Sequence, residues 1–158
     1  MWSGKPQKKS GAFKCAAEKE DGVTTPESPG IAGILETVLY VADLNRAERF
    51  YVEVMGLRQI GKEAARHVFF RIGTGVLLLF RADRTRKAGT LPAHGAHGEI
   101  HVCLRIDPET YDAWRKRIAS HGVAIEREMT WPNNGRSFYF RDPDGNLLEL
   151  ADADIWPR

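Results

Sequence analysis

The sequence predicts an α+β fold built from two β-α-β-β-β modules, whose curved mixed sheets surround a cavity. The main observation is an internal repeat, in which Ile34–Val41 aligns without a gap on Glu99–Ile106. A second match, between Phe70–Gly75 and Phe140–Gly145, lies further along each copy. The apolar positions agree between the copies, and the copies are too far apart for the repeat of a solenoid. We therefore expect two small modules that close on each other or on a second subunit.

The composition narrows the class of protein. A chain of 158 residues with 42% hydrophobic and 28% charged residues is typical of one compact domain. Its net charge of +2 is close to balance, and no apolar run is long enough to span a bilayer, so we expect neither a nucleic-acid nor a membrane partner. The only cysteines, Cys15 and Cys103, form no disulfide framework, which predicts a reducing, cytoplasmic location.

The chain divides into a tail and a domain. Residues 1–30 are rich in Lys, Ser, Gly, Glu and Pro without apolar periodicity, so we expect a disordered tail, and they lack the apolar segment of a signal peptide. Residues 31–154 are expected to form the single domain. Its modules span 31–81 and 99–152, and a polar linker over 82–98 joins them.

The first module begins with the strand Ile34–Val41, which is rich in β-branched and apolar residues. A helix follows, because Asp43 or Asn45 can cap its start and Gly56 can end it. The buried face of this helix is formed by residues at helical spacing, namely Ala47, Phe50, Tyr51, Val54 and Met55. Three short strands complete the module, at Leu57–Gly61, His67–Ile72 and Val76–Phe80.

The second module repeats this order from the strand Glu99–Ile106. Asp107-Pro108 starts its helix, since proline is favoured in a first turn, and His121-Gly122 ends it. The predicted buried face consists of Tyr111, Trp114, Ile118 and Ala119. The last strands are Val123–Arg127, Arg136–Phe140 and Asn146–Leu150, the final two joined by a tight Asp-Pro-Asp-Gly turn.

Three polar residues stand among the apolar residues of these strands: Glu36, His101 and Glu149. A carboxylate or an imidazole is costly to bury without a partner, and a shared cation would offset that cost. Two carboxylates and one imidazole suit a divalent ion such as Zn, Mn, Fe, Ni or Mg and leave coordination positions open. Alternatively, Glu36 is a sheet-edge residue paired with an arginine, and His101 is a hydrogen-bonded histidine of the core.

Three segments, ILETVLYVADLNRAERFYVEVMGL, GEIHVCLRI and GRSFYFRDPDGNLLEL, together resemble the vicinal oxygen chelate superfamily. That superfamily includes glyoxalase I, extradiol dioxygenases, fosfomycin-resistance thiol transferases and bleomycin-resistance proteins. The resemblance implies that Glu36, His101 and Glu149 are metal ligands, that Tyr139 touches the substrate, and that the protein is a homodimer. Modules of the superfamily pair within one chain or across two.

Two departures from the family pattern narrow the activity that the resemblance implies. Many metal-using relatives have His where Glu36 stands, so the ligand set of an extradiol dioxygenase is absent. Glyoxalase I also needs a fourth ligand from the strand equivalent to Val76–Phe80. The repeat puts that position at Leu79, in a strand that is apolar throughout. Both departures disfavour these two enzyme types.

The leading functional hypothesis is a metal-dependent enzyme acting on a small organic substrate with vicinal oxygens, through lyase, isomerase or thiol-transfer chemistry. In it, Glu36 and Glu149 hold the metal and move protons, and Tyr139 donates a hydrogen bond or acts as an acid. The alternative is a metal-free binding protein of the bleomycin-resistance type, for which Trp131, Tyr139 and Phe80 would matter most.

Several other residues carry weaker hypotheses. Cys103 shares a face with His101 but has no evident activating neighbour. Both His94 and His97 precede His101 in a glycine-containing loop and are expected to point elsewhere. Solvent-exposed positions are the default expectation for the three arginines Arg71, Arg81 and Arg141.

Overall fold

A computed structural model describes residues 29–87, 89–152 and 155–156. The chain divides into Met1–Ala32 and Gly33–Arg158, and both modules belong to the second unit. Most of the predicted tail, residues 1–30, lies outside the described residues, so its disorder stays a prediction. No helix in the described part of the chain is long and apolar enough to cross a membrane.

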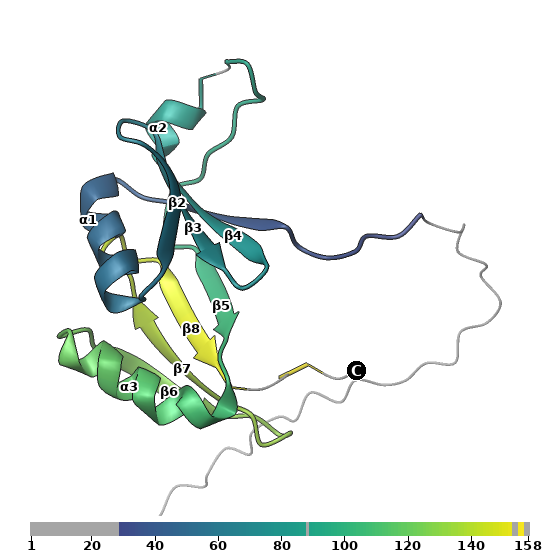
Figure 1. Ribbon diagram of the computed structural model, residues 1–158, viewed down its shortest axis with the longest axis vertical. Coiled ribbons are helices and arrows are strands. Elements are labelled where there is room, and N and C mark those ends of the chain that lie inside the picture. Colours follow the sequence, from purple (N-terminus) through teal and green to yellow (C-terminus); the bar gives the residue numbers. More distant parts are fainter. Residues whose placement is uncertain (1–28, 88, 153–154, 157–158) are drawn as a thin grey trace, which may run out of the picture. The chain divides into compact units, whose positions relative to one another are not determined.

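The first module has the predicted β-α-β-β-β order (Figure 1). It begins with β1 (Glu36–Tyr40) and α1 (Leu44–Arg49), which continues without a break as the π-helix η1 (Phe50–Val54). Strands β2 (Arg58–Glu63), β3 (His67–Ile72) and β4 (Gly75–Phe80) follow. The strand order in the sheet is β1-β4-β3-β2, with β1 parallel to β4 and the other pairs antiparallel.

The second module has the same topology. It comprises β5 (His101–Arg105), the short 3₁₀ helix η2 (Pro108–Thr110), α3 (Tyr111–Ser120), β6 (Ile125–Thr130), β7 (Arg136–Arg141) and β8 (Leu147–Ala151). Its strand order is β5-β8-β7-β6, with β5 parallel to β8. Between the modules, the linker contains the short helix α2 (Ala82–Thr85). The predicted α+β fold of two repeated modules is therefore confirmed.

Both long helices begin and end largely where the sequence predicts. Of the two candidate caps, Asp43 is the one used: its Oδ1 accepts the N–H groups of Asn45 and Arg46 at 2.9 and 3.1 Å. Gly56 follows η1 with φ of 65°, a conformation that glycine adopts without strain. The predicted buried face of the second helix was wrong at one residue: Ala119 is exposed, while Tyr111 and Ile118 are buried as predicted.

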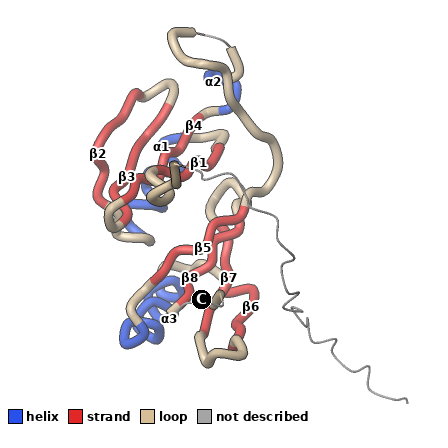
Figure 2. The backbone as a smooth tube through the Cα atoms, turned by 90° about the vertical axis from the view of Figure 1, so that its right-hand side faces the viewer, coloured by secondary structure: helices blue, strands red, loops and turns tan. Residues whose placement is uncertain are grey.

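One face of each sheet packs against its own helix, α1 on β3 and β4 and α3 on β6. Strand alternation sends every second side chain into this core, so Leu39, Leu77 and Leu79 are fully buried. The helix residues predicted to be buried in the first module, from Ala47 to Met55, all belong to the same cluster. The sheets share no strand pairing and do not close on each other within one chain (Figure 2).

Polar contacts join the two modules on the helix side. The Tyr51 hydroxyl donates to Oδ2 of Asp142 at 3.0 Å, in the turn between β7 and β8. From α3, the Arg117 guanidinium donates to the carbonyls of Val54 and Glu53 at 2.7 and 2.6 Å. These carbonyls end η1 and lack helical partners, so Arg117 satisfies them. The opposite face of each sheet is left without a covering helix.

Candidate functional site

The open face of the second sheet carries the polar residues that the sequence singles out. In β5, Val102 and Leu104 pack against the core, so His101 and Cys103 point to the opposite face. In β8, the neighbouring strand, Cys103 stands directly opposite Glu149. On the other side of β8, Glu149 is paired with Tyr139 of β7. The predicted grouping of His101, Glu149 and Tyr139 on one face is therefore observed.

The orientation of the His101 ring follows from its hydrogen bond to the backbone. Its Nδ1 lies 3.1 Å from the carbonyl oxygen of Leu147. A carbonyl oxygen only accepts, so Nδ1 carries the proton of the neutral ring and Nε2 is an acceptor. Nε2 lies 3.4 Å from Oε2 of Glu149, which is also an acceptor. Two acceptors thus face each other, an arrangement that a shared cation or a second proton on the ring would satisfy.

Glu149 is the buried member of this pair. Its side chain is 4% exposed, whereas that of His101 is 47% exposed. The second carboxylate oxygen, Oε1, is buried without a hydrogen-bond partner in the described part of the chain. An unpaired buried carboxylate oxygen is costly. Its presence beside an exposed imidazole fits a site that binds a cation from solvent.

Two neighbours of Glu149 remain protonated. Burial raises the pKa of the Tyr139 hydroxyl, and its hydrogen bond to the Glu149 carboxylate raises it further. Burial likewise raises the pKa of the Cys103 thiol to about 12, with the negative charge of Glu149 as the second cause. Cys103 is therefore a poor nucleophile here, as the sequence predicts. Tyr139 is a hydrogen-bond donor at neutral pH.

Glu36 does not join this pair. It lies at the start of β1, which is the edge strand of the first sheet, and it is exposed. Among the described residues, no group of three or more His, Cys, Asp or Glu side chains is placed to hold a metal ion. One chain therefore brings together two of the three predicted ligands, and the three-ligand set stays a prediction.

The strand pairing corrects the residue assigned to the fourth-ligand position. Glu149 stands opposite Cys103, and the matching residue of the first sheet, opposite Val38, is Leu78. The sequence alignment puts Leu79 there, but Leu79 is paired with Leu39 and is buried in the core. The paired residues Arg71 and Val76 are five positions apart, whereas the equivalent pair Arg141 and Leu147 is six apart, and this extra residue shifts the alignment. Leu78 is apolar, so this position still offers no ligand.

A pocket of about 410 Å³ adjoins the His101–Glu149 pair on the same open face. It is lined by Glu126, Arg127, Met129, Trp131, Tyr139, Arg141 and Leu147. Trp131 forms part of its wall, and its ring N–H donates to Ser137 Oγ at 2.9 Å. The guanidinium of Arg141 is engaged by the carboxylates of Glu99 and Glu126 at 2.6 and 3.1 Å.

Arg127 and Met129 were not singled out by sequence reasoning. Both lie in β6, whose three consecutive charged residues, Glu126, Arg127 and Glu128, are typical of a solvent-exposed strand. The register shift in β6 is what puts these two residues on the open face, and the sequence does not predict that shift.

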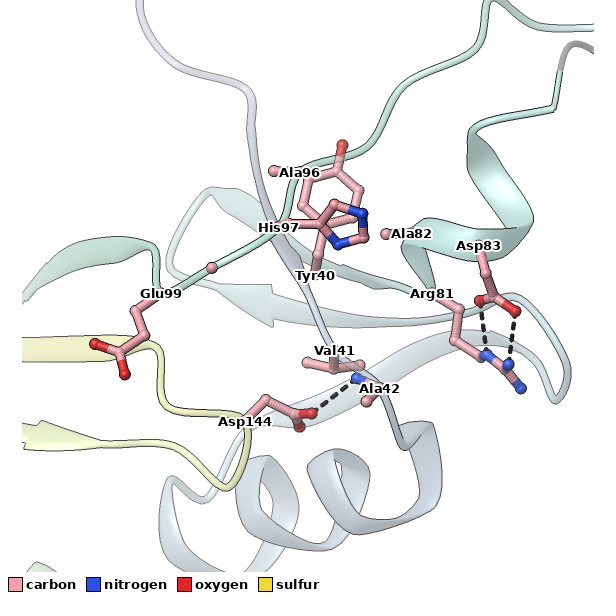
Figure 3. A pocket seen from close by; sticks show the side chains of 11 residues that line it. Tyr40, Val41, Ala42, Arg81, Ala82, Asp83, Ala96, His97, Glu99 and Asp144 are labelled. Atoms are coloured by element: carbon pink, nitrogen blue, oxygen red, sulfur yellow. Dashed lines mark hydrogen bonds and ion pairs between the residues drawn. The ribbon is translucent and has the colours of Figure 1, made fainter.

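A second pocket of about 410 Å³ lies between β1, the linker and the turn before β8 (Figure 3). Arg81 lines it and is held by two hydrogen bonds to the Asp83 carboxylate, at 3.0 and 2.7 Å. His97 also lines it. Its neighbour His94 instead contacts the Tyr40 hydroxyl at 2.7 Å. Neither histidine is grouped with His101, as the sequence predicts.

The remaining predicted residues lie elsewhere. Arg71 donates to the carbonyls of Thr74 and Gly75, across the turn that follows β3. Phe80 is on the open face of the first sheet, where it packs against the rings of His67, Phe69 and His94. This open face is therefore aromatic, whereas that of the second sheet is polar.

Two repeated modules, one of which presents a carboxylate–imidazole pair beside a pocket, define a two-module α+β protein with a candidate site on an open sheet face. The model of the Glyoxalase/Bleomycin resistance protein/Dioxygenase superfamily matches residues 33–150, and the chain belongs to this superfamily.

Individual relatives support this membership. The chain is 30% identical over 133 residues to the metallothiol transferase FosB of Shouchella clausii, covering 81% of this chain and 85% of FosB. It is 28% identical over 127 residues to the fosfomycin resistance protein FosX of Listeria monocytogenes, covering 76% and 89%. A solved lactoylglutathione lyase from Agrobacterium tumefaciens has a TM-score of 0.77 and 37% identity, covering 80% of this chain and 98% of that one.

Proposed function

We propose that the protein is a divalent-metal-dependent enzyme that acts on a small organic substrate with vicinal oxygens, by thiol-transfer, lyase or isomerase chemistry. The observation that carries this proposal is the acceptor pair formed by His101 Nε2 and Glu149 Oε2 at 3.4 Å. The unpartnered buried oxygen of Glu149 supports it, because a bound cation would satisfy both carboxylate oxygens.

We further propose that the third ligand, Glu36, comes from a second copy of the chain. In support, Glu36 is exposed on an edge strand and is not grouped with His101 in its own chain. The apolar residues just before it, Ile34 and Leu35, are 84% and 75% exposed. A second copy that covers them would bury apolar surface and bring Glu36 to the other copy's site. The working molecule is then a homodimer.

The bound ion would supply Lewis-acid polarisation of the substrate oxygens. The residues of the chain do the rest. Tyr139 turns its hydroxyl from the Glu149 carboxylate to the substrate and donates a hydrogen bond there. Either carboxylate, Glu36 or Glu149, accepts a proton from the substrate and returns it. Because Leu78 offers no fourth ligand, the site keeps more open positions than the glyoxalase I ligand set would. FosB is named a metallothiol transferase, so transfer of a thiol to a small substrate is the first reaction to assay.

Metal content tests the proposal. The protein is purified without added metal, analysed for bound elements, and titrated with Mn(II), the ion in a FosX structure that shares this fold at a TM-score of 0.61. The variant His101→Ala should lose at least about tenfold in metal affinity. The control His97→Ala removes an exposed linker histidine and should keep the parent affinity. Absence of bound metal in the parent, together with an unchanged titration of His101→Ala, would overturn the proposal.

The rival function is a metal-free protein that binds a small molecule. The pocket wall formed by Trp131 and Tyr139 favours it. A ligand-induced rise in melting temperature that persists unchanged in excess chelator would support this rival. In either case we propose a cytoplasmic location, since Cys103 is a free thiol.

A further inference from the structure

In the described part of the chain, the pocket beside the His101–Glu149 pair contains one arginine without a carboxylate partner. Among the described residues, the guanidinium of Arg127 has no ion-pair partner, whereas Arg141 on the other side of the pocket is paired with Glu126 and Glu99. Arg141 is thus already compensated by two carboxylates. Among the described residues that line the pocket, the guanidinium of Arg127 is the cation left to pair with a bound anion.

A bulge in β6 is what turns Arg127 toward the pocket. Ile125 is paired with Phe140, but the next pair is Arg127 with Tyr139, so Glu126 is an extra residue. In a regular ladder without the bulge, Glu126 would stand opposite Tyr139 and Arg127 opposite Phe138, which points into the core. Bulges next to active sites commonly redirect a side chain in this way.

The first module has the same bulge but not the same residue. In β2 the register shifts between Gln59 and Gly61, and Gly61 occupies the place that Arg127 has in β6. The bulge thus belongs to the shared fold, while the arginine is particular to the module that carries the carboxylate–imidazole pair. The fold itself does not require an arginine at this position.

The remaining wall of the pocket is apolar. Met129, Trp131 and Leu147 line it, and Tyr139 separates it from Glu149. A volume of about 410 Å³ lies in the range of pockets that hold drug-sized ligands, well above what a molecule of a few atoms fills. A ligand that fits has an apolar or aromatic body for this wall and an acidic group for Arg127.

We infer that Arg127 is a specificity-determining residue, and that the site takes small organic anions with an apolar body, the acidic group on Arg127 and the reacting oxygens toward Glu149. This inference rests on the proposed function, because it names the substrate class of the same face. The acidic group is a carboxylate or a phosphonate, which share the geometry that a guanidinium binds with two hydrogen bonds.

Calorimetric titration with matched probes tests the inference. The probes are 2-naphthoate, 2-naphthylphosphonate, the neutral 2-naphthamide, and propionate, which lacks the apolar body. The parent should bind at least one naphthyl anion about tenfold or more tightly than the amide, and more tightly than propionate. Whichever anion binds more tightly identifies the acidic group.

Substitution of the arginine then isolates its role. Arg127→Gln should abolish the preference for the anion while keeping the affinity for the amide. Arg58→Gln removes an exposed arginine from β2 and should change neither affinity. Equal binding of anion and amide by the parent, or an anion preference that survives in Arg127→Gln, would overturn the inference.

All titrations are repeated in excess chelator, where the anion preference should persist because Arg127 does not depend on the metal. Failure of metal binding with a retained anion preference would overturn only the metal-dependent function. Loss of the preference with intact metal binding would overturn only the inference about Arg127.

Discussion

The carboxylate of Glu149 combines deep burial with an incomplete set of partners. Oε2 faces the acceptor nitrogen of His101 and Oε1 has no partner among the described residues. Replacement of Oε2 by an amide nitrogen would give His101 the donor that it lacks. Glu149→Gln removes little volume, so the fold should tolerate it. A donor would then face the acceptor nitrogen of His101, and the pair would need no cation.

We therefore expect Glu149→Gln to separate stability from metal binding. In chelator its free energy of unfolding should equal that of the parent or exceed it by up to about 1 kcal/mol, since one hydrogen bond is gained. Addition of Mn(II) should raise the melting temperature of the parent and not that of the variant. The control Glu128→Gln, which alters an exposed ion pair with Arg115, should respond to Mn(II) like the parent. An equal response of Glu149→Gln would contradict the assignment of Glu149 as a ligand.

His67, on the open face of the first sheet, gives the stability a dependence on pH. Its ring stacks on Phe69 with centroids 4.1 Å apart, and its Nδ1 is buried without a hydrogen-bond partner in the described structure. Burial lowers the pKa of His67 below its ordinary value of 6.5, with Glu63 and Arg66 as smaller, opposed influences. The folded protein therefore takes up the proton less readily than the unfolded chain does.

Stability should consequently be lost as the pH falls below about 6.5, where the unfolded chain gains a proton that folded His67 resists. His67→Phe keeps the stacked ring and removes the titration. Urea denaturation at pH 7.5 and 5.5 should show a smaller loss in this variant than in the parent. His97→Phe, which removes an exposed histidine, should retain the parent's loss. An identical loss in His67→Phe would exclude His67 as the source.

At the scale of single residues, the sequence was informative wherever strand alternation decides the answer. Alternation within each strand predicts that His101 shares a face with Cys103 and that Glu149 shares a face with Leu147, and the pairing of β5 with β8 puts both sets on the same face. It does not predict which of these side chains is buried, so the exposure of Glu36 was missed. The alignment also mistook Leu79 for Leu78, because one extra residue in a turn changes the face of every residue after it.

The turn between β7 and β8 was predicted from the sequence, but its contact with a distant helix was not. The sequence predicts a tight turn at Asp142, since Pro and Gly follow. In the structure Asp142 is 4% exposed, and its Oδ1 accepts the backbone N–H groups of Asp144 and Asn146. Its Oδ2 accepts from the Asn146 side chain and from the Tyr51 hydroxyl. Local turn preferences predict the contacts of Asp142 with Asp144 and Asn146. They do not predict the contact with Tyr51, which belongs to a distant helix.

Tyr51→Phe tests the contribution of that contact. Removal of the hydroxyl leaves the Asp142 carboxylate with one donor fewer in a buried place, so the free energy of unfolding should fall by about 1–3 kcal/mol. Chemical denaturation provides the measurement. The control Tyr111→Phe removes a longer bond, 3.3 Å to the carbonyl of Ser137, and should cost less. A loss for Tyr51→Phe no larger than that for Tyr111→Phe would show that the Asp142 contact contributes little.

At the scale of whole elements, the spacing of apolar residues predicted most of the buried helix residues, because burial along a helix follows the helical period. Although the second half of the first helical segment is a π-helix, the five residues predicted to form its buried face are all buried: Ala47, Phe50, Tyr51, Val54 and Met55. A π-helix widens the turn by one residue, and no residue type signals it locally. The bounds of His67–Ile72 were predicted correctly, while other strand ends were displaced by up to three residues, since pairing rather than propensity sets where a strand ends.

At the scale of the molecule, the two modules have complementary open faces. The first sheet presents Phe69 and Phe80 with the aromatic ring of Tyr40 beside them, whereas the second presents the carboxylate–imidazole pair and its pocket. Within one chain these sheets do not close on each other. The internal repeat does not predict whether the two sheets close on each other. The same repeat is found whether the modules pair within one chain or across two chains.

Mixing two defective variants tests exchange between chains directly. If Glu36 of one copy completes the site of the other, then Glu36→Ala and the double variant His101→Ala/Glu149→Gln should each lose tight Mn(II) binding as homodimers. After unfolding and refolding together, half of the dimers combine the two variants, and each of these has one site with all its ligands. The mixture should recover about one quarter of the parent's tight sites per chain, as symmetry requires. Sedimentation should give a dimer for the parent and for both variants. If refolding restores mixed dimers but no tight sites, Glu36 does not act across the subunits.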